Sequence, residues 1–499
     1  MIQGLEKLRW RGLRPAVNSV VVARAVVAVC VGAVIVFVTV RQGGPVFDDP
    51  YILFRYADHL GTGRGWNFNP TSSSENAVTS SLYVVLLATM RSVGLNVISA
   101  ASLMFFVTTF AAAAFTGLAL ERSGRRTAGA LAALLIASSP MLSSFRGMES
   151  SLFLCLVAAA LYSALSRRSP MVTGVVLGLL VLTRPDGLAV GAILAIVFFV
   201  LDRDRRLERR GWTQFGIGAA LPVVVFGLFA LVTFGNPFPS TLAAKIAQLD
   251  SGLWRPYLQG SREVILSLHD GSPRIVQILL LMLVIVALGG AVATARQRLA
   301  WQMVVTLVVA TVGLALFYAV MGIPAYPWYY ALPIYTVLVL ASIGFDVGIG
   351  VLTRWPLAPL VTTASLASVL VFTGLWFTID SPTKARVDFI EIGEWLRDNT
   401  DPQATVAAME IGKIAWFSER NMVDYLGLLD SDANEAVARG DFLWWASHYQ
   451  PDYWVTRGYF ADEPFFDSTC FRSSFTPVFR AQVLTVYRRT QQIPAPAEC

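Results

Sequence analysis

Two adjacent aspartates, Asp48 and Asp49, follow the first long apolar segment of this 499-residue chain. Charged side chains at a membrane boundary are energetically costly, so their presence there indicates a function. A carboxylate at such a place can act as a general base that removes the proton of a hydroxyl group. A structural role is the alternative, since aspartate is favoured at the N-cap and in the first turn of a helix. These residue types leave both roles open.

Cations in other loops fit the same chemistry. A sugar that leaves a lipid phosphate needs a base for the incoming hydroxyl and positive groups for the departing phosphate. Arginine can bind phosphate through two parallel hydrogen bonds, whereas lysine acts as a point charge. We therefore expect Asp48 to be the base of such a transfer. The candidate phosphate-binding residues are Arg184, Lys245, Arg146 and Arg55.

Acidic, amide and aromatic residues of these loops are candidates for substrate binding: Glu149, Asp186, Tyr329, Tyr330, Trp328, Glu75 and Asn76. Simpler alternatives exist, because Arg146 with Glu149 and Arg184 with Asp186 can form local salt bridges. The run PAYPWYY at 324–330 can also be an interfacial aromatic belt. The sequence requires no cofactor and its three histidines are scattered, although the acidic pair could hold a divalent cation.

The composition places these loops in a membrane protein. The chain is 55% hydrophobic and 14% charged, with a mean hydropathy of +0.59. Long apolar runs cross lipid as helices because a helix satisfies its own backbone hydrogen bonds. We therefore predict a polytopic α-helical membrane protein. The eleven predicted spans are 19–40, 100–120, 127–139, 152–165, 171–183, 187–201, 213–234, 274–294, 302–320, 331–350 and 357–377.

The placement of lysine and arginine predicts the orientation of these spans. Positive residues concentrate in alternate loops, such as those around 122–126 and 203–210, and this side should be cytoplasmic. The net charge of +6 therefore reports topology and gives no argument for nucleic acid. The other loops, including the first outer loop at 41–99, should face the outside of the cell membrane. The active site is expected on that periplasmic or extracellular side.

The apolar runs end near residue 377, which predicts two domains, a transmembrane domain at 1–377 and an exterior domain at 378–499. The exterior part alternates helical and strand-like segments, which is typical of a small α/β domain. Its predicted helices are 385–398 and 411–417, and its predicted strands are 404–408, 423–426, 454–457 and a pair within 477–488. Cys470 and Cys499 both lie in this part, where a disulfide is chemically allowed but not established by sequence.

Five segments resemble, in order, motifs of bacterial GT-C membrane glycosyltransferases, and most of all those of actinobacterial (mycobacterial) terminal β-(1→2)-arabinofuranosyltransferases. They are DDPYILFRYADHLGTGRGWNFNP at 48–70, GMES at 147–150, RPDG at 184–187, NPFPSTLAAK at 236–245 and VAAMEIGKIAWFSERNMVDYLGLLD at 406–430. The resemblance implies a GT-C fold, a decaprenyl-phosphate arabinofuranose donor and an arabinan acceptor. It also implies Asp48 as the base and Asp49 as a supporting acid or metal contact.

The sequence departs from these motifs after residue 70. TSSSENAVTSS replaces the acid-aromatic loop of the family, so Glu75 and Asn76 are its substitutes and the sugar stays open. A polyprenyl-phosphate mannose donor, with a cell-wall polysaccharide or glycolipid acceptor, is one alternative. A transporter or flippase of lipid-linked sugars is another, and it would require ionisable residues within the spans and repeat symmetry.

Overall fold

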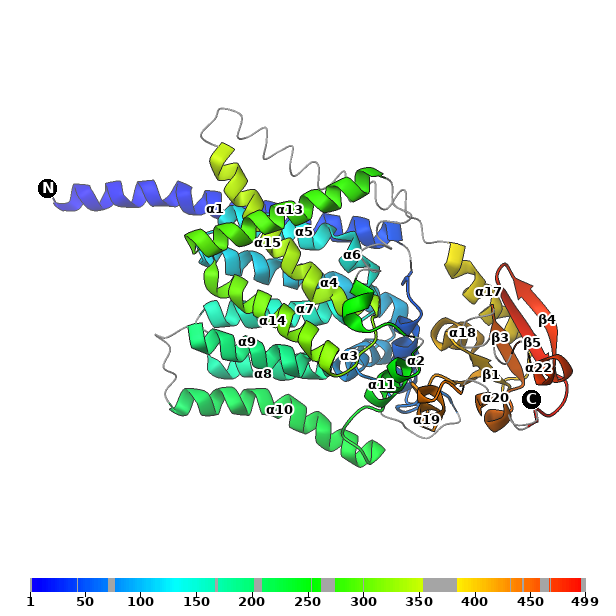
Figure 1. Cartoon of the computed structure of the whole chain (residues 1–499). Coiled ribbons are helices and arrows are strands. Elements are labelled where there is room, and N and C mark those ends of the chain that lie inside the picture. Colours follow the sequence, from blue (N-terminus) through cyan, green and yellow to red (C-terminus); the bar gives the residue numbers. More distant parts are fainter. Residues whose placement is uncertain are drawn as a thin grey trace.

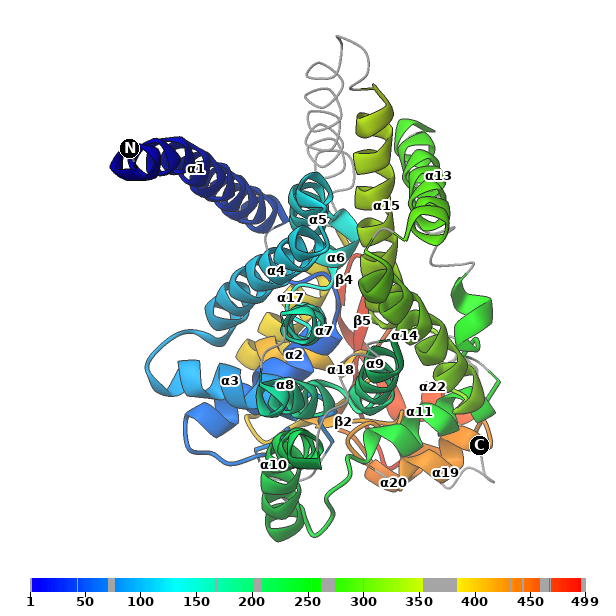
Figure 2. The same ribbon diagram turned by 90° about the vertical axis from the view of Figure 1, so that its left-hand side faces the viewer.

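The computed structural model describes residues 2–42, 44–70, 77–166, 169–201, 209–252, 254–261, 274–298, 300–352, 384–430, 432–441, 444–457, 466 and 468–494. A bundle of roughly parallel and antiparallel helices carries a small sheet domain at one end (Figure 1). Figure 2 views the bundle along its helices, with α1, α10 and α13 at its periphery. The helices of the bundle are α1 (Ile2–Gln42), α4 (Val97–Arg122), α5 (Arg126–Ser138), α6 (Pro140–Ser144), α7 (Ser150–Leu165), α8 (Pro170–Thr183), α9 (Gly187–Leu201), α10 (Arg209–Phe234), α13 (Arg274–Gln297), α14 (Trp301–Val320) and α15 (Ala331–Leu352).

Seven helices of the described part are long and apolar enough to cross a membrane, and the chain is a multi-pass membrane protein. They are Val21–Arg41, Val97–Arg122, Arg126–Ser144, Arg209–Phe234, Gln277–Gln297, Trp301–Val320 and Pro327–Val351. Each matches a predicted span. The predicted spans at 152–165, 171–183 and 187–201 are apolar helices of fewer than 18 described residues. The eleventh, at 357–377, lies outside the described residues.

Close helix contacts in the bundle depend on small residues, which are what lipid-embedded helices use to approach one another. Gly174 and Gly178 of α8 face α10, and a Cβ atom on either would lie 2.3 or 2.4 Å from a backbone oxygen of α10. Gly290 of α13 and Gly344 of α15 are equally confined at their contact. These glycines therefore set the spacing of the helix pairs at the rim.

Shorter elements lie at the end of the bundle that meets the sheet domain (Figure 1). They are α2 (Asp49–Gly61), α3 (Ser81–Ser92), α11 (Thr241–Asp250) and the 3₁₀ helix η1 (Pro327–Tyr330). The opposite end carries ion pairs of Glu121 with Arg24 and Arg126, and of Arg125 with Asp346.

The C-terminal domain is built on a five-stranded mixed sheet of order β2-β1-β3-β5-β4. Strands β1 and β2 pair in parallel, as do β1 and β3, while β5 pairs antiparallel with β3 and β4. Its strands are β1 (Thr405–Ala408), β2 (Asn421–Val423), β3 (Tyr453–Thr456), β4 (Phe475–Ala481) and β5 (Leu484–Arg489). Its helices are α17 (Lys384–Asn399), α18 (Ile411–Ser418), α19 (Ala433–Ala438), α20 (Trp444–Tyr449) and α22 (Thr469–Ser474).

One predicted strand of this domain is misplaced. The expected strand at 423–426 ends at Val423 in the structure, because Asp424 starts a turn. The Asp424 carboxylate accepts hydrogen bonds from the backbone N–H groups of Leu426 and Leu429. These bonds satisfy the turn locally in place of a strand ladder. Cys470 is disulfide-bonded, whereas Cys30 and Cys155 are free, and Cys499 lies outside the described residues.

Candidate active site

Asp48 immediately precedes α2 and binds a different helix. Its side chain makes no cap hydrogen bond on α2, so the alternative in which Asp48 only caps its own helix does not hold. Its two carboxylate oxygens instead accept hydrogen bonds from the backbone N–H groups of Gly412 and Lys413, both at 2.7 Å. These groups open α18, where backbone donors lack partners within the helix. Burial raises the pKa of Asp48 to about 7, against the lowering effect of the two N–H donors.

Asp49 is the carboxylate of the pair that is left without a partner. It is partly buried, and within the described part of the chain its side chain forms no ion pair and no hydrogen bond to another residue. Burial raises its pKa most, the charge of Lys245 lowers it, and the charge of Glu410 raises it further. A cation from the bundle loops and an acid from the C-terminal domain therefore act on Asp49 in opposite directions.

Lys245 projects from α11 toward an aromatic cluster. Its Nζ atom lies 3.8 Å from the centre of the Tyr326 ring, a distance at which the ring stabilises an ammonium group. Over the residues that the structure describes, Lys245 has no ion pair and no side-chain hydrogen bond. Tyr326 stacks on Trp328 with ring centres 5.0 Å apart, and Trp328 meets the edge of Phe47 at 5.6 Å. The aromatic cluster thus connects Lys245 to the residue before Asp48.

Arg184 is enclosed in a buried ionic network. Its guanidinium donates to Asp186 at 3.0–3.2 Å, to Glu149 at 3.0 Å and to the Tyr318 hydroxyl at 3.1 Å. The Tyr318 hydroxyl also donates to Asp186. The Arg184, Glu149 and Asp186 side chains are only 5–8% exposed. The salt bridge between Arg184 and Asp186, an alternative offered by the sequence, is present. The alternative pair of Arg146 and Glu149 does not form, because Glu149 binds Arg184 instead.

Two other predicted phosphate-binding arginines contact backbone carbonyls. Arg146 is buried and donates to the Thr39 carbonyl at 2.6 Å. Arg55, in α2, donates to the carbonyls of Phe68, Ala415 and Arg420 at 2.6–2.7 Å. Charged hydrogen bonds of this kind tie segments together. Among the four predicted phosphate ligands, the described contacts leave Lys245 as the available cation.

The remaining predicted residues divide between this site and its surroundings. Tyr329 stacks at 4.9 Å over the Arg184 guanidinium and meets the edge of Tyr326 at 5.9 Å. Tyr330 is buried, stacks on Tyr257 and donates to its carbonyl at 2.6 Å, so it supports the loop. Glu75 and Asn76 lie outside the described residues.

Sequence reasoning recognised residues 406–430 as a motif but did not predict that they contact Asp48. Glu410, Gly412 and Lys413 lie at the start of α18, directly after strand β1. The Lys413 ammonium donates to the Val46 carbonyl at 3.0 Å, just before the aspartates. The pattern of a short apolar strand, a glycine and a helix was visible in the sequence, and the carboxyl end of a parallel strand is a common place for functional loops. The sequence pattern did not indicate that the start of α18 binds Asp48.

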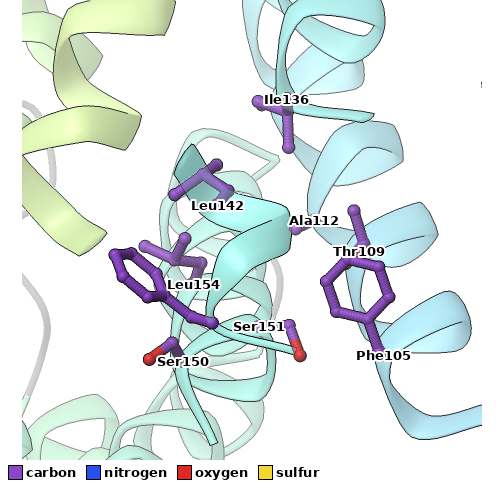
Figure 3. A pocket seen from close by; sticks show the side chains of 9 residues that line it. Phe105, Thr109, Ala112, Ile136, Leu142, Ser150, Ser151 and Leu154 are labelled. Carbon is purple, nitrogen blue, oxygen red and sulfur yellow. The ribbon is translucent and has the colours of Figure 1, made fainter. Parts of the chain in front are cut away.

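A small apolar crevice lies beside the site (Figure 3). It has room for about one water molecule, and Phe145 of its wall lies 6.2 Å from the Phe47 ring. Its other lining residues come from α4, α5, α6 and α7: Phe105, Thr109, Ala112, Ile136, Leu142, Ser150, Ser151 and Leu154. Within the described ranges, no group of three or more His, Cys, Asp or Glu side chains could hold a metal ion.

Comparisons with known proteins place this geometry in a fold. Residues 378–493 match a family model described as a domain of unknown function (DUF8728). The comparison with curated protein sequences gives no match. Solved structures match a larger part of the chain than this family model does. ArnT from Cupriavidus metallidurans bound to undecaprenyl phosphate aligns with a TM-score of 0.58 at 14% identity, over 95% of this chain and 99% of ArnT.

Two further structures share the arrangement. The Archaeoglobus fulgidus oligosaccharyltransferase in the apo form gives a TM-score of 0.56 at 13% identity, over 87% of this chain and 69% of that protein. The arabinofuranosyltransferase AftD from Mycobacteria gives 0.54 at 15% identity, over 94% of this chain but only 40% of AftD. The chain therefore has a GT-C-like fold, that of membrane glycosyltransferases, with the C-terminal mixed-sheet domain docked on its loops.

Proposed function

We propose that this protein is a glycosyltransferase that moves a sugar from a polyprenyl-phosphate donor to a hydroxyl group of an acceptor. The observation that carries the proposal is that a carboxylate, Asp49, and an ammonium, Lys245, act on each other through their charges. Neither side chain forms an ion pair or a hydrogen bond to another residue of the described chain, and the Tyr326 ring lies beside Lys245. Undecaprenyl phosphate in ArnT and dolichol phosphate in the A. fulgidus enzyme AglB support a lipid-phosphate donor.

In this reaction the acceptor oxygen attacks the anomeric carbon, and the bond from that carbon to the phosphate oxygen breaks. The polyprenyl phosphate leaves with the electron pair of the broken bond, and the acceptor proton passes to the base. We assign the base to Asp49 and not to Asp48, the reverse of the expectation from sequence, because both Asp48 oxygens already accept backbone hydrogen bonds. Lys245 stabilises the charge on the departing phosphate.

The reaction is proposed to occur on the outer face of the membrane. The loops that carry Asp49, Glu149, Arg184 and Tyr326 meet at the end of the bundle opposite the Glu121 ion pairs. The positive-inside rule makes the Glu121 end cytoplasmic. The disulfide of Cys470 also favours an oxidising compartment for the C-terminal domain.

The proposed sugar is arabinofuranose, with a cell-wall polysaccharide or glycolipid as acceptor. The sequence motifs and the shared fold with AftD support this choice over mannose. The test uses proteoliposomes of the full chain with radiolabelled decaprenyl-phosphate arabinose or, separately, decaprenyl-phosphate mannose, followed by linkage analysis of the product. Arabinose in a new glycosidic bond supports the proposal. Lipid-linked sugar that crosses the bilayer without any transfer would contradict it and favour a flippase.

Lys245→Ala is expected to raise the KM for the donor by roughly 10- to 100-fold, because a charged hydrogen bond contributes about 1.5–3 kcal/mol. The KM for the acceptor should change much less. Lys245→Arg keeps the charge and should recover part of the donor affinity. Steady-state kinetics at varied donor concentration measure the effect. An unchanged donor KM in the alanine variant would remove Lys245 from the phosphate site.

A further inference from the structure

Helix α2 of the first outer loop and helix α18 of the C-terminal domain lie side by side, although about 360 residues separate them (Figures 1 and 2). Asp48, before the first turn of α2, binds the N–H groups that begin α18. Arg55, two turns further on, donates to the Ala415 carbonyl at 2.6 Å and the Arg420 carbonyl at 2.7 Å. Asp48 and Arg55 therefore bind α18 near its N-terminal and C-terminal ends, respectively.

The charges at these contacts suit the ends they meet. A carboxylate is favourable at the positive N-terminus of a helix, and a guanidinium is favourable near the negative C-terminus. The seven-residue separation of Asp48 and Arg55 spans about 10 Å along a helix, and the eight residues of α18 span about 12 Å. The spacing of Asp48, which precedes α2, and Arg55 within it thus approximates the length of α18.

The contact also depends on a glycine. A Cβ atom at Gly412 would lie 2.3 Å from the Asp48 carbonyl oxygen and 2.8 Å from its carboxylate. Any larger residue at 412 would push the two helices apart, because a contact this short cannot be accommodated by backbone atoms. Asn69 adds a third attachment, since its side-chain amide and oxygen bond the backbone carbonyl and N–H of Met422 at 2.8 Å each.

We infer that α18 is the element that positions the catalytic loop: by binding Asp48 and Arg55 it fixes α2 and, with it, the position of Asp49. This inference rests on the proposed function, and it makes Asp48 and Gly412 positioning residues for the base. The C-terminal domain then contributes directly to the geometry of the active site.

The same helix brings a charge to the site. Glu410, directly before α18, raises the pKa of Asp49, whereas Lys245 of α11 lowers it. Asp49 in turn raises the pKa of two neighbouring groups, Asp48 and Tyr326, through its charge. Displacement of α18 should therefore alter both the position of the base and the pH at which it becomes active.

The test compares Asp48→Ala and Gly412→Ala with Gly348→Ala, a helical glycine whose added Cβ meets nothing within 4 Å. Hydrogen exchange of the 411–418 amides is expected to speed up about 10- to 100-fold in the first two variants, since charged hydrogen bonds are lost. Their kcat should fall by roughly 10- to 100-fold because the base is misplaced, with the donor KM nearly unchanged. Gly348→Ala should match the wild type in both readouts.

Two outcomes would overturn the inference. One is an unchanged rate of hydrogen exchange at the 411–418 amides in both Asp48→Ala and Gly412→Ala. The other is a loss of activity in Asp48→Ala as large as that in Asp49→Asn while exchange stays slow, which would make Asp48 the base itself. Hydrogen exchange can be measured without sugar transfer. A wild-type protein without transferase activity would contradict the proposed function, but the exchange rates would still show whether Asp48 and Gly412 hold α18 in place. Glu410→Gln should move the acid limb of the pH profile to lower pH, which a purely structural clamp would not do.

Discussion

Asp49→Asn is expected to lower kcat by about 10²- to 10⁴-fold, the range that a general base contributes to proton transfer. The amide keeps the size of the side chain but cannot take the proton of the acceptor hydroxyl. Because the Asp49 side chain makes no hydrogen bond to another residue of the described chain, its replacement should leave the fold and the donor KM close to those of the wild type. Single-turnover transfer with radiolabelled donor measures the effect.

The matched control is Asp398→Asn, which removes an exposed carboxylate of the C-terminal domain that pairs with its neighbour Arg397. It should transfer sugar at the wild-type rate. Asp48→Asn keeps one hydrogen-bond acceptor for α18 and should lie between the two. An Asp49→Asn variant with full activity would remove Asp49 from the chemistry and return the base to Asp48.

The pH profile gives a separate check on this base. Burial raises the pKa of Asp49 most, Lys245 lowers it by a smaller effect, and Glu410 raises it by an effect smaller still. A base works only when deprotonated, so kcat/KM should fall as the pH drops through this raised pKa, at a pH above the ordinary aspartate value of 3.8. Lys245→Ala should move the acid limb to higher pH. A profile that stays flat down to pH 4 would contradict an elevated pKa at the base.

Much of this arrangement was predictable because membrane spans impose it. A predominantly apolar run must cross lipid as a helix, and alternate loops must then meet at one end of the bundle. That reasoning brought Asp49, Glu149, Arg184 and Lys245 to the same end, where the structure also has them. The order of elements in the C-terminal domain followed from ordinary strand and helix patterns, apart from the turn at Asp424.

The assignment of partners was not predictable. A sequence shows that an arginine is present at a loop, but its hydrogen bonds depend on segments that fold against it. Arg55 reaches carbonyls about 360 residues away, and Asp48 reaches α18 across 364 residues. Of the cations that looked suited to phosphate, three are already occupied by carboxylates or carbonyls. Buried charges need such partners. A cation that can bind substrate is therefore better recognised by the absence of a carboxylate or carbonyl partner.

Arg184→Ala tests this distinction most severely, and it is expected to destabilise the protein by about 3–5 kcal/mol, the effect of removing one partner from a buried ion pair. The variant leaves Glu149 and Asp186 buried without their shared cation, with side chains only 5% and 8% exposed. Tyr329 also loses the guanidinium beneath its ring. The midpoint of thermal unfolding in detergent should therefore fall strongly.

Two further variants separate this role from phosphate binding. Arg184→Met combined with Glu149→Gln and Asp186→Asn removes the uncompensated charges, so it should be more stable than Arg184→Ala. Arg397→Ala, in an exposed pair with Asp398, should leave the unfolding midpoint unchanged. A direct phosphate ligand would behave in the opposite way: Arg184→Ala would keep the wild-type midpoint and raise only the donor KM. That result would require the network to open when donor binds, since every nitrogen of Arg184 is engaged in the closed arrangement.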